Sequence, residues 1–179
     1  LDLSVLPTFL EMRPRLMALT QMSNMLGTIN PVAEIARQAH QAGALILVDA
    51  AQSVPHLPVD VQALDVDFLV FSAHKMCGPT GLGVLFAREA LLEAMPPFLG
   101  GGDMIKRVEL RSFVPNDVPY KFEAGTPPIA EGIGLQAAVE FLERVGRTAI
   151  QSHEQALVAY AIERLEEVPG VRIYGPNAS

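Results

Sequence analysis

The stretch that decides the fold reads Asp67-Phe-Leu-Val-Phe-Ser72-Ala-His74-Lys75-Met-Cys-Gly78-Pro-Thr-Gly81-Leu-Gly83. It opens with a continuous apolar run, residues 68–71, which is typical of a strand buried on both faces of a sheet. The run leads into a polar cluster with a single lysine, and then into a turn with three glycines. Ligands bind at the carboxyl ends of strands in open α/β sheets, so this layout predicts an active site.

The polar cluster offers groups for anion binding and for nucleophilic chemistry. Ser72 and His74 can donate hydrogen bonds to an anion, and Lys75 carries an amine that can act as a nucleophile. The glycines at 78, 81 and 83 allow the backbone to turn sharply and to approach a ligand. A solvated loop lysine beside glycines is the alternative that this segment alone leaves open.

A second apolar run, residues 45–48, also ends in polar side chains. Asp49 follows the run directly, and Gln52 comes three residues later. An aspartate in this position is also a common helix cap or turn former. Taken together, the two strand ends indicate one site.

A third strand is predicted over residues 16–22, and it too ends in polar residues, Ser23 and Asn24. The alternative for Asn24 is a simple turn former. A helix is expected next, with Asn30 as its cap and Pro31 at its first position. Its predicted buried face has helical spacing and contains Val32, Ile35, Ala36 and Ala39.

Gly43 is expected to end this helix in a left-handed conformation. The repeated order of strand and helix predicts right-handed crossovers and a largely parallel sheet. The three strand ends should therefore share one edge. A further strand over residues 84–87 should be antiparallel, because only a short turn precedes it.

The remaining segments are predicted from their apolar spacing and their glycines and prolines. Residues 1–15 should form a short helix packed on the sheet, residues 53–64 a proline-rich approach to a helical turn, and residues 88–95 a helix. Residues 96–104 should have no regular structure, and residues 120–126 should form a strand leading to a turn. A simple cap of the next helix by Thr126 is the alternative to a binding role there, and both can hold at once. Residues 128–168 should be helical with a break near Gly146. The expected buried stripes are Leu3, Val5, Leu6, Phe9 and Leu10; Ile133, Leu135, Ala138, Val139 and Leu142; and Leu157, Tyr160, Ala161 and Leu165.

Composition excludes several function classes. The 179 residues are 50% hydrophobic and 18% charged, which is enough for one good core of a globular protein. The net charge of −7 argues against nucleic acid as a partner, because phosphate backbones select basic surfaces. No apolar run is long enough to span a membrane, and neither a metal-ligand spacing nor a signal peptide is apparent. The single cysteine indicates a reducing compartment, with the cytoplasm as the default.

Four separated motifs occur along the chain. They are Ser23-Asn24-x-x-Gly27-Thr28-x-x-Pro31, Asp49-Ala-Ala-Gln52, Ser72-Ala-His74-Lys75 with Gly78-Pro-Thr-Gly81, and Phe122-Glu-Ala-Gly125-Thr126-Pro127. In this order they resemble the class V branch of the fold-type I pyridoxal-phosphate enzymes. The closest resemblance is to the cysteine desulfurases of the group that serves iron–sulfur cluster assembly and selenocysteine breakdown.

The resemblance implies the fold and the extent of the chain. It implies an α/β fold with a mostly parallel sheet and helices on both faces, followed by the start of a small C-terminal α+β domain. Residues 1–125 would be the later part of the large cofactor-binding domain, and residues 126–179 the connecting helices and the start of the small one. The chain begins at Leu1 and ends in an expected strand, Gly170–Ser179, that has no following partner. It is therefore expected to be an excerpt that is inactive alone.

The resemblance also assigns a role to each candidate site residue. Lys75 would form the Schiff base with pyridoxal 5′-phosphate and shuttle the α-proton of the substrate. Asp49 would keep the pyridine nitrogen protonated, and Gln52 would hydrogen-bond the ring oxygen. Ser72 and His74 would bind the phosphate, with Asn24 close to substrate and cofactor. Gly125 and Thr126 would reach the phosphate of the cofactor in the partner subunit of a homodimer.

The reaction implied is the conversion of L-cysteine to L-alanine, with the sulfur left as a persulfide on an enzyme cysteine and passed on to a possible acceptor protein. The persulfide cysteine is expected downstream of this chain, so Cys77 is not assigned that role. His56, in a proline-flanked connection, is expected to be structural. The alternatives are another class V enzyme (an aminotransferase, epimerase or kynureninase-like lyase) or a non-catalytic scaffold. A plain nucleotide-binding domain is disfavoured, because no strand is followed by a Gly-x-Gly-x-x-Gly turn.

Overall fold

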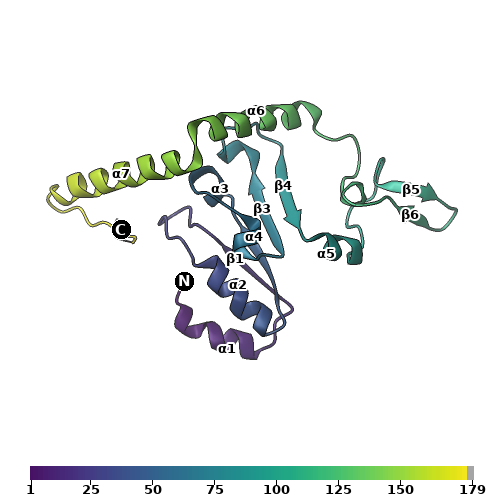
Figure 1. Cartoon of the computed structure of the whole chain (residues 1–179), viewed down its shortest axis with the longest axis horizontal. Coiled ribbons are helices and arrows are strands. Elements are labelled where there is room, and N and C mark those ends of the chain that lie inside the picture. The colour runs from purple at the N-terminus through teal and green to yellow at the C-terminus, as the bar shows by residue number, and fades with distance from the viewer. Residues whose placement is uncertain (177–179) are drawn as a thin grey trace.

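The structure, a computed structural model, describes residues 1–176. Its centre is a four-stranded sheet in the order β1-β2-β3-β4 (Figure 1). The strands are β1 (Leu16–Thr20), β2 (Leu45–Asp49), β3 (Phe68–Ser72) and β4 (Gly83–Ala87). The first three run parallel, and β4 is antiparallel to β3. The predicted largely parallel sheet is confirmed, and its three parallel strands end at the same edge.

The core lies around the two middle strands. Ile46 and Val48 of β2 are fully buried, and Phe68 and Leu69 of β3 are nearly so. The later residues of β3 are only partly buried, so the apolar run is enclosed at its start more than at its end. The open end is the carboxyl edge of the sheet.

Helix α2 (Val32–Gln41) packs on this core with the face that its spacing predicts. Val32, Ile35, Ala36 and Ala39 are each 2% exposed or less. Gly43 has a φ of 79°, which confirms the left-handed stop. The predicted cap is wrong: the helix starts after Pro31, and the Asn30 side chain instead donates a hydrogen bond to the Thr20 carbonyl at 2.7 Å.

The short elements between the strands follow the expected outline. They are α3 (Ser53–His56), α4 (Val61–Leu64), η2 (Ala73–Lys75) and α5 (Glu89–Ala94). The N-terminal segment forms η1 (Leu3–Val5) and α1 (Leu6–Glu11). Its predicted stripe is only partly correct. Leu6 is buried and Leu10 packs on the core, whereas Leu3, Val5 and Phe9 are exposed.

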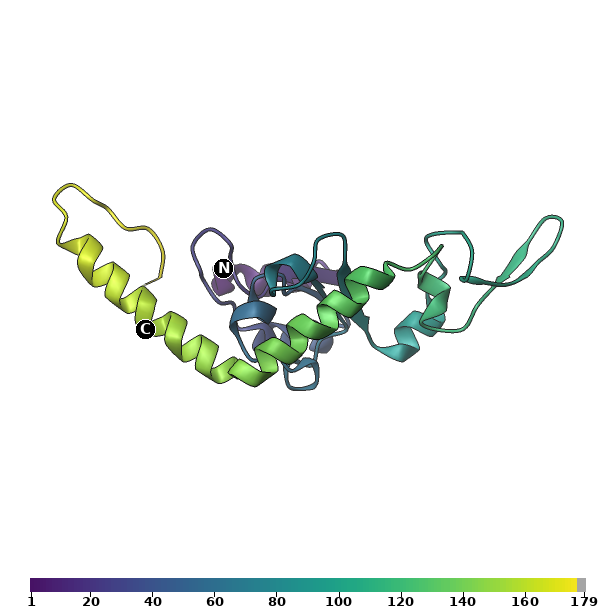
Figure 2. The same cartoon turned by 90° about the horizontal axis from the view of Figure 1, so that it is seen from above.

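Two predictions for the middle of the chain are corrected. An antiparallel hairpin of β5 (Ile105–Val108) and β6 (Phe113–Pro115), which was not predicted, projects away from the sheet (Figures 1 and 2). The predicted strand at 120–126 is instead the short helix η3 (Tyr120–Phe122) followed by a turn. The physical reason is local: the backbone N–H groups of Phe122 and Glu123 donate to the carbonyls of Pro119 and Tyr120, each at 3.0 Å, and these bonds close a helical turn in which Lys121 is only 8% exposed.

The helical region after this turn is divided as predicted. Helices α6 (Ile129–Val145) and α7 (Arg147–Glu166) are separated at Gly146, which has a φ of 92°. The expected cap by Thr126 is wrong, because Pro128 holds the N-cap position without a side-chain hydrogen bond. Seen from above, α6 passes over the body of the sheet and α7 continues beyond it (Figure 2).

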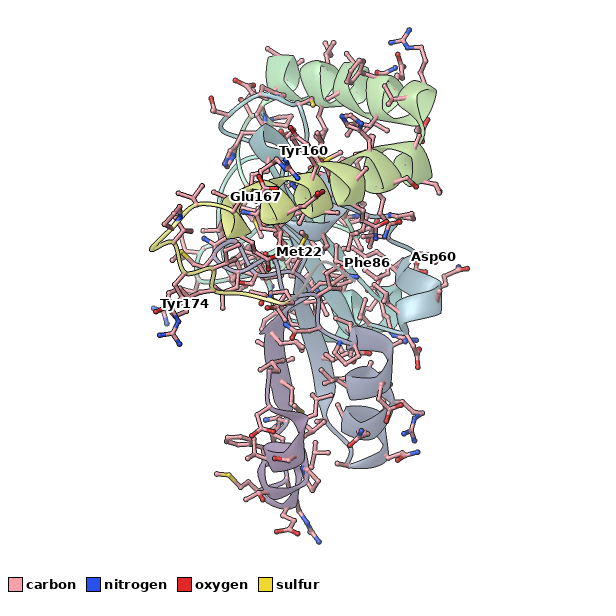
Figure 3. The ribbon with its side chains drawn as sticks, turned by 90° about the vertical axis from the view of Figure 1, so that its left-hand side faces the viewer. Met22, Asp60, Phe86, Tyr160, Glu167 and Tyr174 are labelled. Carbon is pink, nitrogen blue, oxygen red and sulfur yellow. The ribbon has the colours of Figure 1, made fainter. Side chains whose placement is uncertain are left out.

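Helix α6 is packed, but α7 is exposed. Ala138 and Leu142 of α6 are buried, Leu135 and Val139 pack against the core, and only Ile133 of the predicted stripe is exposed. On α7 the predicted burial is wrong, because Leu157 is 53% and Tyr160 62% exposed. Figure 3 shows Tyr160 on this helix, with the C-terminal segment bearing Tyr174 below it.

The final predicted strand is not formed over residues 171–176, and its last part, residues 177–179, lies outside the described residues. The segment instead passes the loop after β1, where a Cβ added to Gly175 would lie 3.3 Å from the Leu26 carbonyl oxygen. In the part of the chain that the structure describes, no helix is long and apolar enough to cross a membrane.

Candidate active site

The carboxyl ends of β2 and β3 bring the predicted polar residues to one edge. Asp49 is the last residue of β2 and pairs with Val70 of β3, two residues before Ser72. His74 and Lys75 follow at once in η2. Adjacent strands lie about 4.8 Å apart, so this register places Asp49 at the same edge of the sheet as Ser72 and the segment with His74 and Lys75 that follows it.

These side chains are available to a ligand. Asp49, His74 and Lys75 are exposed, while Gln52 and Ser72 are half-buried. The Asp49 carboxylate accepts one hydrogen bond, from the backbone N–H of Ala51 at 2.9 Å. Across residues 1–176, the other four side chains make no hydrogen bond to another residue. The cluster therefore has donors and acceptors with free capacity.

A buried polar pair holds the loop after β2, and sequence reasoning did not predict it. The Ser53 hydroxyl, fully buried, donates to Gln21 Oε1 at 2.6 Å. The Gln21 backbone N–H donates to the Asp49 carbonyl at 2.9 Å. Together these bonds link the ends of β1 and β2 beside Asp49 and Gln52. The only sequence signal for this hydrogen bond is the presence of a serine, a possible donor, directly after Gln52.

The turn after Lys75 is tight enough to require glycine at position 78. A Cβ added there would lie 2.7 Å from the Ala73 carbonyl oxygen, far inside contact distance. The backbone N–H of Gly78 donates to that same oxygen at 3.0 Å. Cys77, next to this glycine, is exposed and has a φ of 64°. The close turn fixes the course of the chain immediately after the lysine.

Helix α6 packs directly on this turn. A Cβ added to Gly134 would lie 3.2 Å from Cγ of Pro79, which is tighter than ordinary contact. The absence of a side chain at position 134 therefore lets the helix approach the proline ring. The contact links the lysine turn to the helix that leads toward the C-terminus.

Asn24 lies in the loop that follows β1, at the same edge of the sheet. It is exposed, and the Ser23 hydroxyl accepts hydrogen bonds from the backbone N–H groups of Met25 and Leu26, both at 3.2 Å. Gly27 completes the turn with a φ of 67°. The structure thus places Asn24 in a tight loop on the site's side of the sheet.

Gly125 and Thr126 are not gathered with the other site residues. Gly125 donates its backbone N–H to the Gly102 carbonyl at 2.9 Å and has a φ of 89°. The turn borders a cavity of about 240 Å³ that is lined by Asp103, Asn116, Tyr120, Glu123, Gly125 and Pro127. Among the described residues, this turn faces the β5–β6 region rather than the lysine.

His56 has the structural partner that its setting predicts. Its Nδ1 lies 2.8 Å from the Glu154 carboxylate, and Arg147 donates to the Val54 carbonyl. These contacts join α3 to α7. Over residues 1–176 no group of His, Cys, Asp and Glu side chains has the arrangement of a metal site.

A separate ionic cluster lies at the opposite end of β3. The Asp67 carboxylate, nearly buried, lies 2.8 Å from His40 Nε2 and 3.0 Å from Arg88 Nε, and it accepts the Ile46 N–H at 2.8 Å. Arg88 also bonds to Asp65, and this hydrogen bond is the main reason that the pKa of the Asp65 carboxyl lies below its usual range. Because the cluster is far along the strand from Lys75, its role is structural.

The sheet, the tight turn that contains Lys75 and the polar residues at the carboxyl ends of β2 and β3 indicate the class of the protein. The class-V aminotransferase family matches residues 1–179, and the chain belongs to this family. The fold is accordingly that of the fold-type I class V enzymes, as the resemblance predicted.

Comparison with individual relatives shows which members of the family the chain is similar to. The chain is 50% identical over its full length to a probable cysteine desulfurase of Streptomyces coelicolor, and 54% identical over 98% of its length to a cysteine desulfurase of Dickeya dadantii, covering 43% of each. The crystal structure of the cysteine desulfurase CsdA from Escherichia coli superposes with a TM-score of 0.95 at 43% identity, over 99% of this chain and 45% of that one. The chain thus spans less than half the length of the relatives it matches.

Proposed function

We propose that this chain is part of a pyridoxal-phosphate-dependent cysteine desulfurase that converts L-cysteine to L-alanine and serves iron–sulfur cluster assembly. The observation that carries the proposal is the pairing of β2 with β3, which sets Asp49 beside the Ser72-to-Lys75 segment. Identities of 50% and more to proteins named cysteine desulfurase support the same activity.

The donor set at the sheet edge fits pyridoxal phosphate. The cofactor presents an aldehyde, a pyridine nitrogen, a ring oxygen and a phosphate. Lys75 offers an amine for the aldehyde and Asp49 a carboxylate for the protonated nitrogen, and these groups are exposed. Gln52 offers an amide for the ring oxygen, and the hydroxyl of Ser72 and imidazole of His74 can donate to the phosphate. Each group of the cofactor therefore has a matching side chain.

When bound, the cofactor supplies an electron sink that stabilises negative charge at the α-carbon of an amino acid. Asp49 would strengthen that sink by keeping a proton on the pyridine nitrogen. Lys75 would hold the cofactor through its amine and, once released, would move the α-proton of the substrate. Asn24, in the loop after β1 at the same edge of the sheet, would contact substrate or cofactor.

The sulfur leaves L-cysteine by attack of an enzyme thiolate on the substrate sulfur. The bond between the β-carbon and the sulfur breaks, and the sulfur becomes the outer atom of a persulfide on the enzyme cysteine. The β-carbon keeps the electron pair of the broken bond and is protonated to give alanine. Cys77 does not suit this role. The tight turn from Ala73 to Gly78 fixes the position of Cys77, in a part of the chain that runs away from Lys75. The persulfide cysteine, and the surface that meets a sulfur-acceptor protein, are assigned to parts of the enzyme outside this chain.

We further propose that the enzyme is a homodimer in which Gly125 and Thr126 bind the phosphate of the partner's cofactor. Two observations support this. The turn does not face Lys75 of its own chain, and the hairpin beside it exposes Val108 by 69% and Leu110 by 99%. A division into a cofactor domain over residues 1–125 and a connecting segment from 126 onward agrees with the start of α6 at Ile129.

The test uses full-length enzyme that contains this chain, purified with pyridoxal phosphate. Alanine formed from L-cysteine should depend on added thiol and should fall at least about 10²-fold in Lys75→Ala, which also loses the visible absorption band of the bound cofactor. Lys106→Ala, at an exposed lysine of β5, should retain both. A cofactor band without alanine would favour another class V activity, and the absence of both would favour a non-catalytic scaffold.

A further inference from the structure

Lys121 is a buried cation that the proposed reaction does not use. It is 8% exposed, whereas Lys75 and Lys106 are exposed. An ammonium group is removed from water at a large cost in free energy unless its donors are paired. The hydrogen-bond partners of Lys121 therefore identify the element to which this side chain is bound.

The partners of Lys121 are the carbonyls at the end of α5. Its Nζ donates to the Leu92 oxygen at 3.0 Å and to the Glu93 oxygen at 2.9 Å. These carbonyls belong to the last turn of the helix, where no intrahelical N–H is available to them. The negative end of the helix dipole also favours a cation here. Within residues 1–176, Lys121 forms no salt bridge with a carboxylate, so the carbonyls at the helix end are its partners.

Helix α5 is itself fixed to the sheet. It follows β4 after one residue, Arg88, whose backbone N–H donates to the Asp67 carbonyl at 3.1 Å. The Arg88 side chain bonds to the Asp67 carboxylate as well. The C-terminal end of α5 is therefore a fixed point relative to β3, the strand that leads to Lys75.

Lys121 lies four residues before Gly125, in the short helix that enters the Gly125–Thr126 turn. Downstream of the turn, α6 is held by the contact between Gly134 and Pro79. Upstream, the side chain of Lys121 ties the entry to α5, and the ammonium also lies 5.4 Å from the centroid of the Phe122 ring. The turn is thus anchored on both sides, downstream through α6 to the turn that follows Lys75 and upstream to the end of α5.

We propose that Lys121 is a positioning residue: by binding the end of α5, it sets the Gly125–Thr126 turn where that turn binds the phosphate of the partner's cofactor. The inference rests on the proposed function. It adds a further requirement for binding of the cofactor phosphate: a buried cation four residues before Gly125, which does not itself contact the cofactor.

The experiment compares two ligands that differ only in the phosphate. Full-length apoenzyme is titrated with pyridoxal phosphate and with pyridoxal, and binding is followed by visible absorption. In Lys121→Met the affinity for pyridoxal phosphate should fall about tenfold, because the turn loses its anchor, whereas the affinity for pyridoxal should change less than about twofold. Lys121→Arg, which keeps a buried cation with several donors, should restore the preference for the phosphate form.

Lys106→Met is the matched control, since it removes an exposed lysine from the same part of the chain, and both affinities should stay unchanged. Equal losses for the two ligands in Lys121→Met, or no loss in a folded dimer, would overturn the inference. If Lys121→Met yields no soluble dimer, Lys121→Gln is titrated against the same criteria. Wild-type enzyme that binds neither ligand would refute the proposed function itself, a result distinct from failure of the Lys121 variants alone.

Discussion

Helices α2 and α7 both carry apolar residues at helical spacing, but α2 has a single apolar face that is buried, whereas α7 is not one-sided over its whole length and is exposed. On α2, apolar residues at helical spacing are all buried against the sheet. On α7, Leu157 and Tyr160 follow the same spacing and are more than half exposed. A few apolar residues at helical spacing therefore predict burial only where the whole helix is one-sided and a partner surface lies close by in the chain.

The difference follows from where the partner surfaces lie. The partner of α2 is β2, whose first residue is only four positions after the helix ends. Helix α7 and residues 173–176 border an open groove of about 950 Å³, together with the loop after β1. The relatives are more than twice as long as this chain, so in those proteins further residues are available to cover the corresponding helix.

The largest effect should come from the packed region. Ile46→Ala empties a fully buried position in the middle of β2, and it should lower the free energy of unfolding by about 3–4 kcal/mol. Chemical denaturation of the full-length enzyme measures this loss, with Ile46→Val as a milder control that should cost about 1 kcal/mol. A cost below 1 kcal/mol for the alanine variant would contradict the close packing of the sheet.

A smaller loss is expected at the ionic cluster that joins α2, β2 and α5 to the start of β3. Asp67→Asn removes the charge that faces His40 and Arg88 and weakens the acceptor for the Ile46 N–H. The expected cost is about 2 kcal/mol, reduced because Arg88 is partly exposed to solvent. Thermal unfolding measures it, and Asp60→Asn, at the exposed cap of α4, is a matched control.

Leu157→Ala sharpens the comparison from the exposed side. In the 179-residue chain the substitution should change the free energy of unfolding by less than about 0.5 kcal/mol, because the side chain is already in water. In the full-length enzyme it should cost about 2 kcal/mol, as expected for a leucine covered by other residues. Equal and small costs in both proteins would show that the stripe stays exposed in the complete enzyme.

The smallest effect should be a pH dependence at the exposed edge of the same ionic cluster. Hydrogen bonding to Arg88, then the charges of Arg88 and His40, lower the pKa of the Asp65 carboxyl. A lowered pKa in the folded state means that the carboxylate stabilises the fold above its unfolded pKa, and that this contribution disappears as the pH falls through the folded value. Asp65→Asn should therefore flatten the fall in melting temperature below about pH 4. An unchanged slope would contradict the interaction.

The sheet and its polar edge could be predicted because their signals are local. Asp49 and Lys75 each follow an apolar run, and Gly43 marks the helix end between two strands. The errors arose where distant contacts decide the structure. Asn30 bonds to the Thr20 carbonyl instead of capping its neighbour helix. Lys121 lies in a helical turn instead of a strand, and its side chain bonds to the end of α5.

Other features had no sequence signal of the expected kind. The β5 strand contains Lys106 and Arg107 in succession and lacks the alternation that marks a half-buried strand, so the hairpin was missed. Ser53 and Gln21 are ordinary polar residues in sequence, and only the fold shows that they join two strand ends beside Asp49. Which residues meet across the sheet depends on register, and register is a property of the whole fold.

The contact between Gly134 and Pro79 has a consequence for sequence divergence. A side chain at position 134 would require the proline ring to move by a few tenths of an ångström, and that ring lies in the turn that follows Lys75. The two positions are therefore not free to vary independently. In an alignment of class V relatives, a residue larger than glycine at position 134 should occur together with a residue smaller than proline at position 79. The two positions should therefore covary, although 55 positions separate them in the sequence.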